Sequence, residues 1–285
     1  MAALYSPREH GFDARLTLVD RCQVALLREL GAQHGDRLIL KGGMAMRAVF
    51  GSMRLTKDID FDRDVSISQL SLENGLVRSL VKAARLSMLQ DPKAEITKST
   101  STTVRARLVG LTADGVSARF EIEVSGRGAA PVGFQRHELV VPPREYGMAP
   151  FSVCTYTSEV LAAMKIHAAL SVQRNAPRDL YDLRDLVRSG VAPIQILSRQ
   201  PEDVLQDFSS RCLGKLEGLS YQLACDELLP FLPLNEREAL TEDAWLEQTL
   251  TVASAIEAWC EQAIEMKRQQ ETDGLEQLVQ PEVPR

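Results

Sequence analysis

Two aspartates, Asp58 and Asp60, are the residues whose type and spacing most clearly suggest chemistry in this 285-residue chain. They belong to the run Asp-Ile-Asp-Phe at positions 58–61. Successive side chains of a β-strand point to opposite faces, so a strand here would place both carboxylates on one face. The two carboxylates would repel each other, and a divalent cation between them removes that repulsion. Mg²⁺ prefers hard oxygen ligands and is usually held by one or two carboxylates together with substrate phosphates.

The segment before these aspartates has the features of an anion-binding turn. Residues 38–40, Leu-Ile-Leu, predict a buried strand, and the pair Gly42-Gly43 predicts a tight turn. Residues 44–50 favour a short helix. Backbone N–H groups at such a turn can bind phosphates. Residues 38–61 therefore predict a site for a metal and a nucleoside triphosphate (NTP). The alternative is an exposed Asp-x-Asp turn beside a structural glycine pair.

Residues 41–61 follow the pattern K-G-G-x-A-x(5)-G-x(2)-R-x-T-x-D-I-D-F. This pattern resembles the first motif of the AbiEii/AbiGii-type toxin nucleotidyltransferases, which belong to the polymerase-β-like nucleotidyltransferase superfamily. The resemblance implies that Asp58 and Asp60 are metal ligands. It also implies nucleotide-binding roles for Lys41, Gly42, Gly43 and Thr56. Relatives usually carry Ser or Thr where this chain has Met44, so phosphate binding here must depend on backbone N–H groups and other side chains.

A third carboxylate is expected on a neighbouring strand. Residues 94–110 predict one or two strands and residues 116–125 another, in which Glu121 and Glu123 share a face. The family places an acidic residue on a strand beside the Asp-x-Asp motif, and Glu123 fits that position best, with Glu121 as second choice. Asp is commoner there than Glu. The alternative is that both glutamates are solvent-facing residues of an amphipathic strand.

Residues 158–187 carry a second group of candidates. They predict a helix that contains Lys165 in a K-x-x-A setting, a break at 175–177, and a second helix opened by Arg-Asp-x-x-Asp. By resemblance, Lys165 contacts the triphosphate, Asp179 is an essential acid, and Asp182 is the second choice, with a role in nucleotide binding. The alternative is a solvated lysine and an N-cap aspartate at Asp179.

The composition, with 45% apolar and 25% charged residues, is typical of a soluble globular protein. No stretch approaches the roughly 20 apolar residues of a membrane span, and no secretion signal precedes the first helix. The five cysteines lack C-x-x-C spacing. We therefore expect a cytoplasmic protein with reduced thiols, no zinc site and no membrane partner.

The net charge of −6 is unevenly distributed. Residues 235–285 hold 12 acidic and 4 basic residues, whereas residues 63–108, called here the basic segment, hold 8 basic and 4 acidic residues. Such a segment is either a solvated surface or a contact for RNA.

The whole pattern predicts an α/β (α+β) protein in two parts. Residues 1–150 would form a nucleotidyltransferase domain with a mixed sheet flanked by helices, including helices near 13–33 and 70–89. Asp91-Pro92 would close the second of these helices, residues 129–148 would be a loop-rich connection, and residues 153–156 a short edge strand. Residues 151–285 would form a helical domain that contributes Lys165 and Asp179 to the site.

These features lead to the hypothesis of a Mg²⁺-dependent nucleotidyltransferase. Asp58, Asp60 and Glu123 would hold two metal ions, and Lys165 and Asp179 would complete the catalytic set. By resemblance, the protein would act in a toxin–antitoxin or phage-defence system with an antitoxin encoded nearby. The acceptor would be tRNA or a protein side chain. The alternatives are a small-molecule nucleotidyltransferase and a non-catalytic protein that binds a nucleotide or a partner.

Overall fold

The computed structural model describes residues 3–64, 67–126 and 133–279, with side chains up to residue 272. The chain packs as two compact units. The first unit consists of Met1–Thr157 and Leu228–Leu240, and the second of Ser158–Glu227 and Thr241–Arg285. The division into functional domains near residue 150 stays a prediction.

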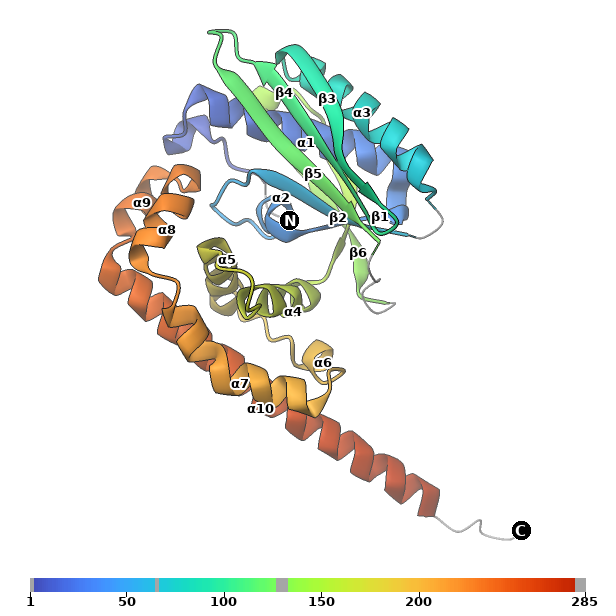
Figure 1. Ribbon diagram of the computed structural model, residues 1–285, viewed down its shortest axis with the longest axis vertical. Coiled ribbons are helices and arrows are strands. Elements are labelled where there is room, and N and C mark those ends of the chain that lie inside the picture. The colour runs from blue at the N-terminus through green and yellow to red at the C-terminus, as the bar shows by residue number, and fades with distance from the viewer. Residues whose placement is uncertain (1–2, 65–66, 127–132, 280–285) are drawn as a thin grey trace, which may run out of the picture. The chain divides into compact units, whose positions relative to one another are not determined.

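A seven-stranded mixed sheet forms the first unit, in the order β3-β4-β5-β2-β1-β7-β6 (Figure 1). The strands are β1 Leu38–Lys41, β2 Asp58–Arg63, β3 Gln90–Thr100, β4 Thr103–Leu111, β5 Ser117–Ser125, β6 Gln135–Val140 and β7 Phe151–Tyr156. The central strand β2 runs antiparallel to β1 and parallel to β5. The predicted mixed α/β fold is confirmed.

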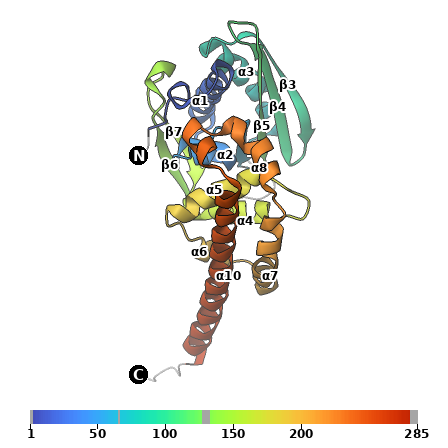
Figure 2. The same cartoon turned by 90° about the vertical axis from the view of Figure 1, so that its left-hand side faces the viewer.

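Two long helices, α1 Ala14–His34 and α3 Gln69–Leu86, cover one face of this sheet, as Figures 1 and 2 show from two sides. Each begins at a side-chain cap: Asp13 accepts a hydrogen bond from Leu16 N at 2.7 Å and Ser68 accepts one from Ser71 N at 3.3 Å. The strands bury apolar side chains toward these helices. The first unit also contains α2 Gly42–Ala48, α9 Leu234–Ala239 and the 3₁₀ turns Arg8–His10, Gly35–Arg37, Arg144–Tyr146 and Leu229–Phe231.

Two sequence predictions about this sheet are wrong. The segment predicted as a loop contains β6, which pairs with β7, so β7 lies between two strands and is not an edge. Asp91-Pro92 does not close a helix but lies inside β3, where the register shifts between Gln90 and Lys93. β3 is an edge strand, where a proline without a backbone N–H is tolerated.

The second unit is helical. Its helices are α4 Ser158–Ala169, α5 Pro177–Arg188, α6 Ile194–Leu197, α7 Glu202–Glu217, α8 Tyr221–Leu228 and α10 Glu242–Val279. α7 packs along α10, and Trp245 Nε1 on α10 donates a hydrogen bond to the Leu219 carbonyl at 2.7 Å. α10 extends to Val279, and residues 280–285 lie outside the described residues.

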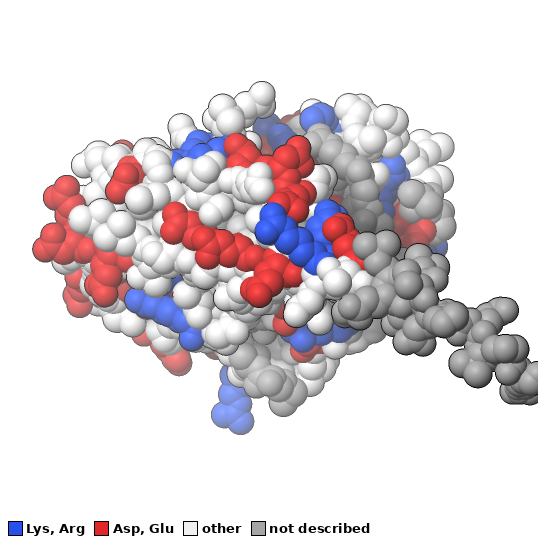
Figure 3. Space-filling model, turned by 90° about the horizontal axis from the view of Figure 1, so that it is seen from below, with Lys and Arg blue, Asp and Glu red and all other residues white. Residues whose placement is uncertain are grey.

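The surface of the second unit is acidic, because residues 241–285, which belong to it, hold 10 acidic and 3 basic residues. α7 and α10 expose Asp203, Asp207, Glu247, Glu261 and Glu265. Acidic side chains also outnumber basic ones on the face of the molecule seen in Figure 3. In the described part of the chain, no helix is both long and apolar enough to cross a bilayer. All five cysteines are free thiols.

Candidate active site

Asp58 and Asp60 lie side by side on the face of β2 that turns away from α1 and α3. Both are half-buried, while Ile59 and Phe61 point to the other face and are buried at 0% and 3% exposure. The predicted strand and its alternation are confirmed. In the register, Asp58 lies opposite Glu121, and Asp60 lies between Lys41 on β1 and Glu123 on β5. The sheet thus gathers charged residues from the two neighbouring strands, β1 and β5, around the two aspartates.

Glycine is required at positions 42 and 43 because neighbouring side chains lie too close to leave room for a Cβ atom. Gly42 has a φ of +67°, and a Cβ atom built on it would lie 2.5 Å from Asp60 Oδ2. A Cβ atom on Gly43 would lie 2.8 Å from Arg54 Nη2 and 2.9 Å from Thr56 Oγ1. The helix α2 begins at Gly42 itself, two residues earlier than predicted. The glycines therefore let the chain approach the Asp60 carboxylate and the segment that precedes β2.

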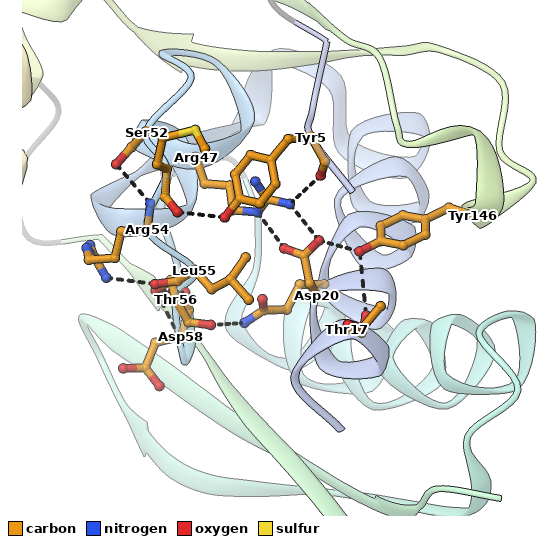
Figure 4. A network of polar contacts seen from close by, with 12 residues as sticks. Tyr5, Thr17, Asp20, Arg47, Ser52, Arg54, Leu55, Thr56, Asp58 and Tyr146 are labelled. Carbon is orange, nitrogen blue, oxygen red and sulfur yellow. Dashed lines mark hydrogen bonds and ion pairs between the residues drawn. The ribbon is translucent and has the colours of Figure 1, made fainter. Parts of the chain in front are cut away.

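Thr56 stabilises the turn into β2, as Figure 4 shows. Its hydroxyl donates to the Asp58 carbonyl at 3.1 Å and accepts from Asp58 N at 3.4 Å. Gln23, buried on α1, donates to the Thr56 carbonyl at 3.2 Å, and Arg54 Nη1 donates to the Leu55 carbonyl at 3.0 Å. The hydroxyl predicted for nucleotide binding is thus engaged with the backbone of a site residue. Arg54, buried at 4% exposure beside Gly43, was not among the predicted site residues.

A buried ion pair connects α1 to α2 behind this turn (Figure 4). Arg47 binds both carboxylate oxygens of Asp20, at 2.6 and 2.8 Å, and both residues are 1% exposed. Tyr146 donates to Asp20 at 2.5 Å, and the Arg47 guanidinium lies 4.2 Å from the centre of the Tyr5 ring. Burial, followed by the Asp20 charge, raises the pKa of Tyr146, so its hydroxyl keeps its proton and remains a donor. This cluster fixes the short helix that follows the glycine pair.

Lys41 contacts a carboxylate of the same sheet face. Its Nζ lies 2.5 Å from Asp62 Oδ1, and Tyr156 donates to Asp62 Oδ2 at 2.9 Å. The Lys41 side chain is 25% exposed. Its role in nucleotide binding stays a prediction.

The two glutamates of β5 are ion-paired to arginines on β4. Arg105 Nη2 lies 2.5 Å from Glu123 Oε2, and Arg107 Nη2 lies 2.9 Å from Glu121 Oε1. The hydrogen bond with Glu123, opposed by partial burial, is the main reason why the pKa of Arg105 is raised. Sequence reasoning missed these partners because they depend on the register of β4 with β5.

The candidate metal ligands differ in how well they fit a divalent cation. Asp58 and Asp60 supply the oxygen donors that Mg²⁺ prefers, and Gly42 leaves space for the Asp60 carboxylate, so this pair fits a divalent cation. Glu123 fits less well because its carboxylate binds Arg105. Within the described residues, no group of three or more His, Cys, Asp or Glu is placed to hold a metal.

The second unit brings together all the residues predicted there. Lys165 Nζ lies 2.8 Å from Asp179 Oδ1 and 2.6 Å from Asp182 Oδ2, and both carboxylates are fully buried. Arg174, which was not predicted, binds the other Asp179 oxygen at 2.6 Å from the loop before α5. The alternative assignments are wrong here: Lys165 is only 7% exposed, and the N-cap of α5 is Ala176.

The charge state of this cluster follows from its contacts. Burial alone would raise the pKa of Asp179, but the Lys165 and Arg174 charges and their hydrogen bonds outweigh burial and lower it. Asp179 is therefore an ionised carboxylate between two cations. Paired with Asp179 and Asp182, Lys165 is held in one position.

Comparison with known proteins decides the family. The family model described as "Nucleotidyl transferase AbiEii toxin, Type IV TA system" matches residues 25–280, which includes both motif-bearing segments. The chain belongs to the AbiEii nucleotidyl transferase toxin family. This confirms the resemblance seen in the sequence and places the protein among the toxins of type IV toxin–antitoxin systems, which implies a cognate antitoxin. No curated protein matches the sequence.

Solved structures support the fold of this AbiEii family member. A putative nucleotidyltransferase from Helicobacter pylori is 17% identical, with a TM-score of 0.54 over 90% of this chain and 99% of that one. MenT4, a nucleotidyltransferase toxin from Mycobacterium tuberculosis H37Rv, is 15% identical, with a TM-score of 0.52 over 94% of each chain. At these identities the likeness shows the fold.

Proposed function

We propose that this AbiEii family member transfers a nucleotidyl group from an NTP to tRNA in the cytoplasm, as the toxin of a toxin–antitoxin or phage-defence system. The antitoxin would be encoded nearby. The observation that carries the proposal is the Asp58–Asp60 pair, which faces one way on β2 with the Asp60 carboxylate against Gly42. Paired carboxylates at a glycine turn suit a metal that binds phosphate oxygens.

Asp58 and Asp60 would hold Mg²⁺. When bound, the metal, expected as two ions, supplies charge stabilisation to the attacking and leaving oxygens of an in-line displacement. Gly42 and Gly43 allow the backbone to approach the Asp60 carboxylate and the Thr56 hydroxyl, and Thr56 orients the backbone of Asp58.

Other residues would bind the nucleotide. Lys165, fixed by Asp179 and Asp182, would offset the charge of the triphosphate, and Lys41 would contribute a second positive charge. Glu123 lies next to Asp60 in the register. Once its carboxylate has separated from Arg105, Glu123 would serve as a third metal ligand or would accept the proton of the attacking hydroxyl.

The test is transfer of label from α-³²P-NTPs into total tRNA or total protein, with Mg²⁺ and with EDTA. We expect label in tRNA, and Asp60→Asn should lower the rate at least about a hundredfold. Asp114→Asn, in the exposed β4–β5 turn, is the matched control and should leave the rate unchanged. Label in protein would replace tRNA as the acceptor. Equal rates for wild type and Asp60→Asn would remove Asp60 from the site.

A non-catalytic role is the second candidate, favoured by the ion pair between Glu123 and Arg105. In that case NTP would bind but no NTP would be consumed with any acceptor. Consumption of NTP only in the presence of small-molecule acceptors would instead support a small-molecule transferase.

A further inference from the structure

The sheet divides the basic segment 63–108 between two faces of the first unit. Arg78, Lys82 and Arg85 lie on α3, and Lys82 forms an ion pair there with Glu29 of α1. Arg63 ends β2, and the other basic residues of the segment, Lys93, Lys98, Arg105 and Arg107, lie on β3 and β4. Ser99 of β3 donates a hydrogen bond to Glu73 of α3 at 2.6 Å, so Ser99 marks the helix side of β3. The basic segment is therefore split between the helix side and the opposite side of the sheet.

The face of β3, β4 and β5 opposite the helices is called here the open face. In an antiparallel pair, residues opposite each other point to the same face. The register places Lys98 opposite Arg105 and, two rows further, Lys93 opposite Val109, which in turn lies opposite Arg119 of β5. The open face thus carries five cations: Lys93, Lys98, Arg105, Arg107 and Arg119.

Three of these five cations are available to a ligand. Arg105 and Arg107 are paired with Glu123 and Glu121. Lys93, Lys98 and Arg119 are exposed, and none of the ion pairs formed by the described residues includes them. The carboxylates that the register places on this face of the three strands are Glu121, Glu123 and Glu95, and Glu95 lies 3.7 Å from Arg107.

This face leads to the Asp58–Asp60 pair. Glu121 lies opposite Asp58 in the register, and Arg119 is two residues before Glu121 on the same strand. With a rise of about 3.3 Å per residue and strands about 4.8 Å apart, the Arg119 Cα lies about 8 Å from that of Asp58. Lys93 and Lys98 lie roughly 15 Å from each other along β3, too far apart for one small phosphate to contact both.

We propose that the open face binds the sugar-phosphate backbone of the RNA acceptor through Lys93, Lys98 and Arg119, and so directs an RNA hydroxyl toward Asp58 and Asp60. This inference rests on the proposed function and names where its acceptor binds. Separated cations on an exposed sheet match the repeated charges of a polyanion. The second unit has an acidic surface, which is not complementary to the negative charges of RNA.

The test compares two double variants, each of which removes two positive charges from the first unit. Lys93→Ser/Arg119→Ser changes the open face, and Arg78→Ser/Arg85→Ser changes exposed residues on α3. Binding of total tRNA is measured by fluorescence anisotropy at several salt concentrations, and label transfer is measured in parallel. Thermal unfolding checks that both variants fold.

We expect the open-face variant to weaken tRNA binding about tenfold or more and to reduce the slope of log K against log salt by about 1.4 to 1.8, as expected for two lost phosphate contacts. The α3 variant should stay within about twofold of wild type. Equal weakening in both variants would mean that net charge alone acts, and would overturn the proposal.

Other outcomes separate this proposal from the function on which it rests. If the open-face variant binds and labels tRNA like wild type, tRNA remains the acceptor but the open face is not its binding surface. If wild type neither binds nor labels tRNA but labels protein, both the surface and the tRNA acceptor are wrong.

Discussion

Replacing Gly42 by alanine tests how closely the glycine turn approaches Asp60. Gly42 and Gly147 have nearly the same positive φ, +67° and +65°. A Cβ atom on Gly42 would lie 2.5 Å from Asp60 Oδ2, whereas one on Gly147 would meet no described atom within 4 Å. Alanine costs about 1–2 kcal/mol in this left-handed conformation at either position. Gly147→Ala therefore reports backbone strain alone, and Gly42→Ala reports strain together with the contact to Asp60.

The size of the additional effect follows from the distance. Ordinary van der Waals contact begins near 3.4 Å, so the Asp60 oxygen must move by about 1 Å to admit the methyl group. A displacement of about 1 Å in a reacting geometry can cost about a hundredfold in rate. We expect both variants to lose about 1–2 kcal/mol in the free energy of unfolding. Gly42→Ala alone should also lose divalent-cation affinity and about a hundredfold in transfer rate.

Three measurements decide this prediction. Urea unfolding gives the free energy of unfolding of each variant, titration calorimetry with Mn²⁺ gives the metal affinity, and label transfer to the acceptor gives the rate. If Gly42→Ala binds Mn²⁺ and transfers label within about threefold of Gly147→Ala, the reasoning about the Asp60 approach is refuted.

Three further predictions concern the charged clusters. Lys165→Met leaves Asp179 and Asp182 buried without their common cation, so urea unfolding should show a loss of about 3–5 kcal/mol; a loss below 1 kcal/mol would contradict the buried pairing. The folded-state pKa of Asp179 is lowered, so its ionised form stabilises the protein at pH values above the unfolded pKa of about 3.9. This contribution to stability disappears as the pH falls through the folded-state pKa. The free energy of unfolding, measured from pH 6 to pH 2, should therefore depend less on pH in Asp179→Asn than in wild type. Identical profiles would argue against a stabilising role of the ionised Asp179 carboxylate. Arg105→Ala releases the Glu123 carboxylate, so Mn²⁺ should bind more tightly by calorimetry at a cost of less than about 1 kcal/mol in stability; unchanged affinity would mean that Glu123 takes no part in metal binding.

Local patterns in the sequence were enough to predict much of the fold. The helices α1 and α3 follow from apolar periodicity, and the alternation of β2 and β5 follows from their period of two. The strand β6 was missed because its residues, Gln135–Val140, are mostly exposed, with one fully buried side chain. A segment whose strand conformation depends on pairing with a distant partner carries little local signal.

The sequence by itself determined which residues of this protein share a motif and, for the strands and helices, which neighbours share a face. It thereby identified the Asp58–Asp60 pair, the glycines before it and the Lys165 segment, because alternation and helical periodicity are properties of a few consecutive residues. Only the tertiary structure decided the ion-pair partners, Arg105 for Glu123 and Asp62 for Lys41. It also decided that the basic segment is divided between two faces of the sheet. These depend on the register between strands that are distant in the chain, and a local pattern does not encode that register.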